Sequence, residues 1–287
     1  MAILLIRNRI MPQSRNLLIR RSVTYKNFFT RLITTLLLLP LVLVVTYEGG
    51  LWFISFVSLT IGIAIFEWSR LCGEKSLIIN ICYSLIGPII SVIYFYWGFE
   101  IALVSIIIFA LICGFTNSRL FYSRLWLSFG ICYLCLPMIC IIKLRMNNFF
   151  GLEYVLFLFI MVWMTDIGAY FVGSLFGGPK LVPSISPQKT WSGAFGGLLF
   201  SLVSAIILYN ILENKTSQTL LFLAVILSIV AQIGDLFESW VKRRFNKKDS
   251  GSIIPGHGGI LDRIDGLLTS APIMLLITLL LRDIAFL

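Results

Sequence analysis

Residues 239–265 read SWVKRRFNKKDSGSIIPGHGGILDRID, and they interrupt a chain that is otherwise mostly apolar. Counted from Asp235, this short stretch holds eleven charged residues, and it contains the only histidine of the protein, His257. Stability alone does not explain such a cluster, because unpaired charge beside hydrocarbon is expensive. Carboxylates, basic side chains and a glycine-rich turn in one stretch indicate phosphoryl-transfer chemistry at a membrane surface.

The composition places the rest of the chain in a membrane. Hydrophobic residues make up 59% of it, charged residues 13%, and the mean hydropathy is +0.96. Continuous apolar runs exclude a β-barrel, whose strands alternate over about ten residues. We predict an all-α, polytopic membrane bundle of about nine transmembrane helices. The runs fall at 32–47, 51–66, 77–97, 100–115, 126–142, 152–173, 192–211, 218–235 and 266–281. Two short pairs, 32–66 and 77–115, are alternatively re-entrant hairpins.

The distribution of Lys and Arg predicts a cytoplasmic N-terminus. Nine alternating spans then place nineteen of these residues inside and four outside. We expect a basic cytoplasmic N-terminal arm over 1–30, suited to anionic lipid rather than to nucleic acid. Residues 31–287 form one membrane domain, with catalytic loops at 173–191 and 235–266 facing the cytoplasm.

Two helices that are consecutive in the sequence bring acidic residues to the same loop. If the 218–235 helix continues, four side chains share one of its faces: Asp235, Glu238, Ser239 and Lys242. The next helix, expected from near Gly259, carries Asp262 and Asp265 three residues apart. Since the helices are antiparallel, we expect Asp235, Asp262 and Asp265 to meet and to hold Mg²⁺. The alternative is a salt-bridged loop in which Arg243, Arg244 and Arg263 neutralise these acids.

The loop between the two helices is rich in glycine. Asp249 opens it, and glycines at 251, 256, 258 and 259 allow backbone N–H groups to approach phosphates. His257 lies in the same turn and is a candidate donor to a phosphate or to departing pyrophosphate. Glycine-rich loops are common, so this feature alone indicates little.

Asp166 is a second anomaly, because it lies inside the apolar run 152–173. An acid within a membrane segment is a functional candidate by default, and Tyr170 follows on the same helix face. The alternative is a hydrogen bond that packs the bundle. In the following loop, Lys189 and Thr190 before a helix start suit a phosphate. The alternative there is a plain helix cap begun by Ser186 and Pro187.

Residues 239–265 resemble the C-terminal motif of the phosphatidate cytidylyltransferases. The matching positions are Ser239, Val241, Lys242, Arg243, Lys248, Asp249, Gly251, Ile254, Pro255, His257, Gly258, Gly259, Ile260, Asp262, Arg263, Ile264 and Asp265. Asp166-x-x-Ala169-Tyr170 and Ser186-Pro187-x-Lys189-Thr190 are similar to two further family motifs, and the resemblance covers about 30–281. Ser192 departs from the family, in which many members carry an acid or amide there.

The resemblance implies a reaction of CTP with phosphatidate from the inner leaflet that gives CDP-diacylglycerol and pyrophosphate. It further implies Mg²⁺ with or without a second cation, a homodimer, and a multi-pass location in the cytoplasmic membrane. We expect the metal at Asp235, Asp249, Asp262 and Asp265, and the phosphates at Lys189, Lys242, Arg243 and Arg263. His257 would assist the leaving group, and Asp166 would lie where the lipid headgroup enters. The expected substrate-binding residues are Asp166, Tyr170, Ser186, Lys189, Thr190, Ser239, Gly258 and Gly259.

The sequence also bears on three other classes of function. A transporter predicts inverted repeats and charges spread along a pore, whereas the acids here cluster at one edge. A polyprenol kinase or a CDP-lipid alcohol phosphotransferase is a different lipid enzyme, and Asp265-Gly266 does not continue the spaced pattern of the latter. A cytidylyltransferase acting on an ether-linked lipid stays open on residues alone.

Overall fold

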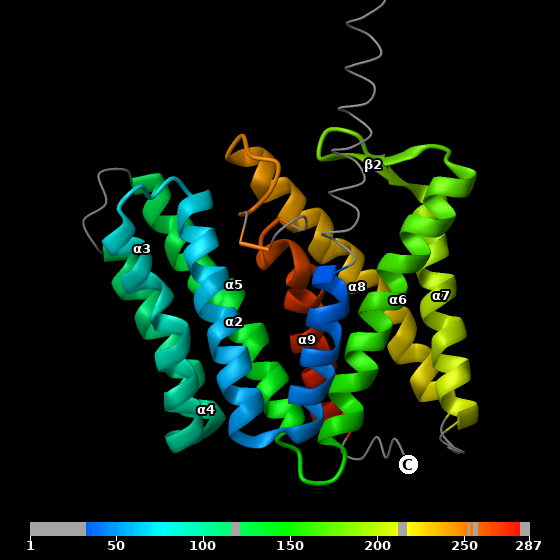
Figure 1. Ribbon diagram of the computed structural model, residues 1–287, viewed down its shortest axis with the longest axis horizontal. Helices are drawn as coiled ribbons and strands as arrows, with labels where there is room; N and C mark the ends of the chain where they lie inside the picture. The colour runs from blue at the N-terminus through cyan, green and yellow to red at the C-terminus, as the bar shows by residue number, and fades with distance from the viewer. Residues whose placement is uncertain (1–32, 116–120, 212–216, 252, 255–257, 282–287) are drawn as a thin grey trace, which may run out of the picture.

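The computed structural model describes the chain except for residues 1–32, 116–120, 212–216, 252, 255–257 and 282–287. The predicted basic arm and His257 therefore lie outside the described residues. Helices dominate what is described, which confirms the predicted all-α class (Figure 1). After a short helix over Ile33–Glu48, the elements are α2 (Gly50–Leu71), α3 (Leu77–Ser84), α4 (Ile86–Phe115), α5 (Phe121–Arg145), α6 (Gly151–Phe176), β1 (Lys180–Val182), β2 (Ser186–Thr190), α7 (Trp191–Ile211), α8 (Ser217–Arg244) and α9 (Leu261–Leu280).

Seven stretches within the described residues are long and apolar enough to cross a membrane. The prediction of about nine holds only approximately, because Ile33–Glu48 is shorter and Leu77–Phe115 is one continuous apolar stretch. That stretch of 39 residues would reach about 58 Å as a straight helix, roughly twice a bilayer core. The chain is therefore a protein with several membrane-spanning helices.

The long stretch turns back at Gly98, where φ is 87° and the backbone leaves the helical region. Glycine tolerates this conformation because it has no Cβ. Past the turn, the Lys143 ammonium lies 5.7 Å from the Phe99 ring, and Gly114 lies against Ser128. The second half of α4 thus runs antiparallel along α5, and the predicted runs 77–97 and 100–115 are separate legs (Figure 1).

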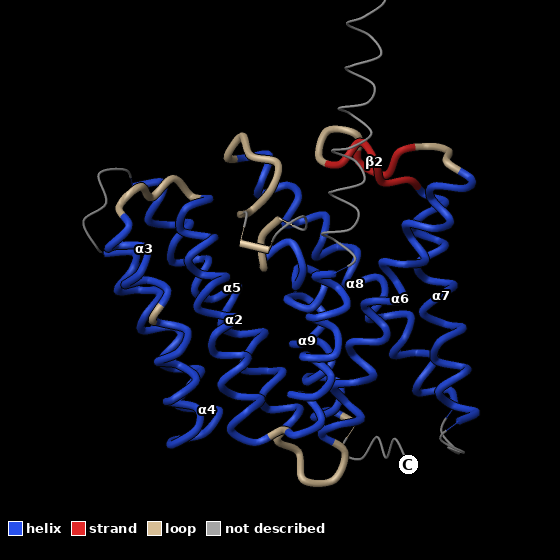
Figure 2. The backbone as a smooth tube through the Cα atoms, in the orientation of Figure 1, coloured by secondary structure: helices blue, strands red, loops and turns tan. Residues whose placement is uncertain are grey.

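The polar loops gather at one edge of the bundle. The end of α8 and the β1–β2 hairpin lie at the upper edge in Figures 1 and 2, and α9 begins below them in the same upper part of the bundle. α8 continues to Arg244, which confirms the predicted extension past the apolar run. α9 begins at Leu261, two residues after Gly259, near which its start was predicted. This edge carries the residues that the sequence analysis singled out.

The hairpin was not predicted. β1 and β2 pair antiparallel, with Lys180 opposite Thr190 and Val182 opposite Ser186. The interpretation in which Ser186 and Pro187 begin the next helix is wrong, since both lie in β2 and α7 begins at Trp191. Thr190 caps that helix through its hydroxyl, which accepts the Gly193 N–H at 3.1 Å.

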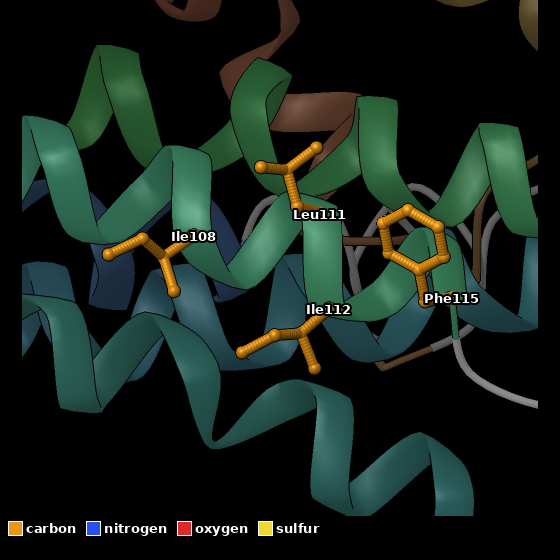
Figure 3. Close-up of a pocket in the computed structure, with 4 residues that line it drawn as sticks. All are labelled: Ile108, Leu111, Ile112 and Phe115. Carbon is orange, nitrogen blue, oxygen red and sulfur yellow. The ribbon is translucent and has the colours of Figure 1, made fainter.

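The core and the outward surface are both apolar, as expected for a membrane protein. Trp68 of α2 is buried and donates its indole N–H to the carbonyl of Trp126 on α5 at 2.8 Å. On the outward face of α4, a shallow hollow is lined by Ile108, Leu111, Ile112 and Phe115, each more than half exposed (Figure 3). No polar side chain lines it, so this face suits contact with lipid chains.

Candidate functional site

Three carboxylates come together where α8 and α9 cross. One oxygen each from Asp235, Glu238 and Asp265 lies within 4.8 Å of the others, and we call these three residues the acid cluster. Asp235 and Glu238 are three residues apart on α8, and Asp265 lies in the second turn of α9. A methyl group on Gly234 would come within 2.8 Å of the Asp265 carbonyl. Glycine at this position therefore lets α9 approach closely enough to place Asp265 in the cluster.

In the described part of the chain, the acid cluster has fewer hydrogen-bond donors around it than its carboxylate oxygens can accept. Glu238 is 0% exposed, and its Oε1 has no hydrogen-bond partner among the described residues. Its other oxygen, Oε2, lies 3.2 Å from the ammonium of Lys242. A buried carboxylate that has one oxygen without a donor and lies close to two more carboxylates requires a proton or a cation. Hard oxygen ligands in this number suit a divalent cation, so the residues fit a metal site.

Two lysines bring positive charge to the cluster from different elements. Lys189 of β2 pairs with Asp235 at 2.5 Å. Lys242 of α8 pairs with both Glu238 and Asp262, the latter at 2.7 Å. Each ammonium is partly exposed, so it can exchange a carboxylate for a phosphate oxygen without entering a dry interior.

Asp262 belongs to the neighbouring loop more than to the acid cluster. Its carboxylate accepts the N–H of Ser250 at 3.1 Å, the Ser250 hydroxyl at 2.9 Å and the Gly259 N–H at 2.9 Å. The predicted meeting of Asp235, Asp262 and Asp265 is thus seen for two of the three, and Asp262 is linked to the others through Lys242. Asp262 as a metal ligand stays a prediction.

Glu67 of α2 was not singled out from the sequence. It is 2% exposed, and its carboxylate accepts the N–H groups of Ile260 at 3.1 Å and Leu261 at 2.9 Å. Glu67 therefore caps the start of α9 from another helix. Methyl groups on Gly251 and Gly259 would both come 2.5 Å from its oxygens, so the loop folds tightly around this carboxylate. An acid beside an apolar run was the available signal, as it was for Asp166.

The remaining predicted residues lie at the same edge but in varied surroundings. Asp166 of α6 is exposed and interacts electrostatically with Asp235, Lys189 and Arg263, so it borders the acid cluster. Tyr170 is 80% exposed. The other members of the set are placed as follows: Thr190 is buried, Ser186, Ser239 and Gly258 are half-buried, Gly259 is buried, and Arg243, Asp249 and Arg263 are exposed.

The β1–β2 hairpin is tied to the end of α8. Arg243 donates from Nε to the carbonyl of Ile185 at 3.2 Å. The Ser192 hydroxyl donates to the carbonyl of Gly177 and lies 3.0 Å from the Thr190 hydroxyl. These contacts hold the hairpin over the acid cluster, with Lys189 reaching down to Asp235. Asp249 as a metal ligand stays a prediction, because the structure leaves it outside the acid cluster.

Comparison with known proteins gives a consistent result. A family model described as the cytidylyltransferase family matches residues 29–281. A phosphatidate cytidylyltransferase of Brucella suis biovar 1 (strain 1330) is 39% identical over 252 residues, covering 87% of this chain and 93% of the relative. One of Staphylococcus saprophyticus is 36% identical over 253 residues, covering 85% and 96%. One of Staphylococcus aureus (strain COL) is 36% identical with the same coverage.

Proposed function

Because the chain belongs to the cytidylyltransferase family, we propose that it transfers the cytidylyl group of CTP to phosphatidate, giving CDP-diacylglycerol and pyrophosphate. Relatives that match over most of both chains bear the name of this activity. The observation that carries the proposal is the acid cluster flanked by Lys189 and Lys242 at one edge of a membrane bundle. Enzymes of lipid phosphates need such a site at the depth of the headgroups.

The chemistry requires little beyond positioning and charge neutralisation. Phosphatidate carries a phosphomonoester with a second pKa near ~6, so it is mostly dianionic at neutral pH and needs no strong base. Its oxygen attacks the α-phosphorus of CTP, a phosphoanhydride P–O bond forms there, and the bond to the β-phosphate breaks. Pyrophosphate leaves with the bonding electron pair. The main obstacle is repulsion between two anions.

Asp235, Glu238 and Asp265 would hold Mg²⁺, since they form a donor-poor cluster of hard oxygen ligands. When bound, the ion neutralises negative charge on triphosphate oxygens and polarises them. Asp249 and Asp262 remain predicted metal ligands, and a second cation remains predicted without assigned ligands. The acid cluster would favour a metal-bound nucleotide, because three carboxylates would repel a free polyanion.

Lys189 and Lys242 would then turn to phosphate oxygens, each giving up a carboxylate partner that the cation takes over. Arg243 and Arg263 are exposed at the same edge and can reach the outer phosphates. Asp166, which borders the acid cluster from α6, would lie beside the entering lipid headgroup. The hydroxyls of Ser186 and Ser239 would bind substrate, and His257 would assist departing pyrophosphate.

The cellular setting follows from the charge distribution. We propose that the loops 173–191 and 235–266 face the cytoplasm, that the protein lies in the cytoplasmic membrane, and that the arm over 1–30 binds anionic lipid. Phosphatidate would enter from the inner leaflet and CTP from the cytoplasm. The homodimer is proposed on the family resemblance alone.

The test uses the purified protein in lipid–detergent micelles with Mg²⁺, phosphatidate and CTP labelled on either the α- or the γ-phosphate. Cytidylyl transfer puts the α-label in the lipid and the γ-label in pyrophosphate, in equal amounts. A kinase would place the γ-label in the lipid, and a transporter would place neither there. Parallel reactions with an ether-linked phosphatidate analogue and with a polyprenol test the alternative substrates. Absence of α-label from the phosphatidate fraction would refute the proposal.

A further inference from the structure

Tyr133 of α5 has a hydroxyl that the fold does not use. Its oxygen is one of three buried side-chain polar atoms without a hydrogen-bond partner in the part of the chain that the structure describes. The other two are Ser128 Oγ and Glu238 Oε1. Burying a hydroxyl without a partner is unfavourable, and phenylalanine would fill the same space without that penalty. The hydroxyl of Tyr133 therefore needs an explanation other than packing.

The ring of Tyr133 is held firmly. It stacks on Phe129 with the two planes 14° apart and the centroids 5.7 Å apart. It also packs against Trp68 at 5.5 Å and against Phe237 at 5.1 Å. With aromatic neighbours from α2, α5 and α8, the ring has little freedom to turn, so the direction of its O–H group is fixed by packing.

The ring of Tyr133 contacts α8 next to residues of the acid cluster. Phe237, which contacts the ring, lies between Asp235 and Glu238 in the sequence of α8. The charges that act on the Tyr133 hydroxyl are those of Glu238, Asp265 and Asp235, in decreasing order. Among the described residues, the Tyr133 hydroxyl therefore lacks an acceptor, and Glu238 Oε1, whose charge acts on it, lacks a donor. A hydrogen-bonded link between them would satisfy both atoms.

We propose that Tyr133 is a positioning residue for the acid cluster, and that its hydroxyl donates through one bridging water to Glu238 Oε1. A single water accepts from the phenol and donates to the carboxylate, so it satisfies both buried atoms. Glu238 is then held toward Asp235 and Asp265 in the arrangement that a divalent cation needs. The inference rests on the proposed metal site, and it adds a third helix to that site's support.

Two variants that each remove one unpartnered hydroxyl test the proposal. Tyr133→Phe removes the group near the acid cluster, and Ser128→Ala is the matched control. Thermal unfolding of the purified protein is followed over a range of Mg²⁺ concentrations, without nucleotide or lipid. For Tyr133→Phe we expect a lower unfolding temperature without Mg²⁺, because the water that bridges to Glu238 Oε1 loses its phenol partner. The Mg²⁺ concentration at half-maximal stabilisation should rise by about tenfold or more, as is typical for loss of a group that supports a metal ligand.

The Ser128→Ala variant should leave the Mg²⁺ midpoint unchanged. A merely structural tyrosine would lower the unfolding temperature without Mg²⁺ and leave the midpoint in place, and that pattern would overturn the proposal. A midpoint within twofold of the parent's would overturn it as well. Asp265→Asn is measured alongside, because it should abolish the Mg²⁺ response. If Mg²⁺ does not stabilise the parent, or if Asp265→Asn responds to Mg²⁺ like the parent, the proposed metal site is wrong. If Asp265→Asn abolishes the response but Tyr133→Phe has the same Mg²⁺ midpoint as the parent, only the role of Tyr133 is wrong.

Discussion

Two buried glutamates at the same edge of the bundle have opposite surroundings. Glu67 accepts hydrogen bonds on both oxygens, from Ile260 and Leu261, and it fastens the start of α9. Glu238 is equally buried, yet one of its oxygens has no donor among the described residues, and its carboxylate lies close to Asp235 and Asp265. A carboxylate whose oxygens both accept hydrogen bonds stabilises the fold. A buried carboxylate that lacks a donor and lies beside other negative charges is stabilised by binding a cation. Glu67 thus supports the structure of the site, whereas Glu238 belongs to its proposed chemistry.

The largest expected effect is on activity, and it comes from changing a residue of the acid cluster. Asp265→Asn keeps the size of the side chain but removes one of the three charges of the acid cluster. We expect cytidylyl transfer to fall by about 10³-fold, because electrostatic stabilisation of phosphoryl transfer is of that order. The rate of α-label incorporation into lipid measures it, with thermal unfolding as the check on folding. Activity within tenfold of the parent would remove Asp265 from the metal site.

The second effect tests the structural side. Glu67→Ala leaves the N–H groups of Ile260 and Leu261 buried without an acceptor, so we expect a loss of about 3 kcal/mol in unfolding free energy. The unfolding temperature without Mg²⁺ measures this loss. Lys247→Gln is the control, since the Lys247 ammonium makes one exposed contact with the carbonyl of Arg70 and should matter little. Equal unfolding temperatures for both variants would contradict the anchoring role of Glu67.

Much of this arrangement could be predicted from the sequence, because it depends on local spacing. Runs of apolar residues located the membrane helices, including the two legs that separate at Gly98. Asp235 and Asp265 were predicted to meet, since consecutive antiparallel helices bring their ends together. Glu238 was placed on the correct helix face, but spacing cannot reveal that one of its oxygens lacks a donor.

The parts that escaped prediction depend on contacts between segments far apart in the chain. Glu67 meets Ile260 across 193 positions, and no local pattern specifies that partner. Tyr133 looks like one more aromatic residue in an apolar run, and only the structure shows its ring packed against Phe237 of α8. The β1–β2 hairpin is short, and its Ser186 and Pro187 were interpreted as a possible helix start, although edge strands also tolerate proline.

A third effect sharpens the comparison through the backbone around Glu67. A methyl group on Gly259 would lie 2.1 Å from the Ser250 hydroxyl and 2.5 Å from Glu67 Oε2, so the loop cannot close around it. We expect Gly259→Ala to cost about 2 kcal/mol, as overpacking typically does, and to be measured as a lower unfolding temperature. The double variant Gly259→Ala with Glu67→Ala should lose less than the sum of the two single changes, because the clash is partly removed. Full additivity would show that the two residues act independently.

The smallest effect has the opposite sign. Glu238→Gln preserves an oxygen for Lys242 and places an N–H₂ group at the Oε1 position of a side chain close to Asp235 and Asp265, so it adds a donor and removes one like charge. We expect the unfolding free energy without Mg²⁺ to rise by about 1 kcal/mol, the usual net contribution of a buried hydrogen bond. Mg²⁺ should then stabilise the variant less than it stabilises the parent, because a ligand charge is gone. The matched change Glu67→Gln should instead destabilise the protein, since its amide nitrogen would face the N–H of Ile260 or Leu261. A loss of stability in both variants would mean that Glu238 is a structural anchor like Glu67, and the distinction between the two sites would fall.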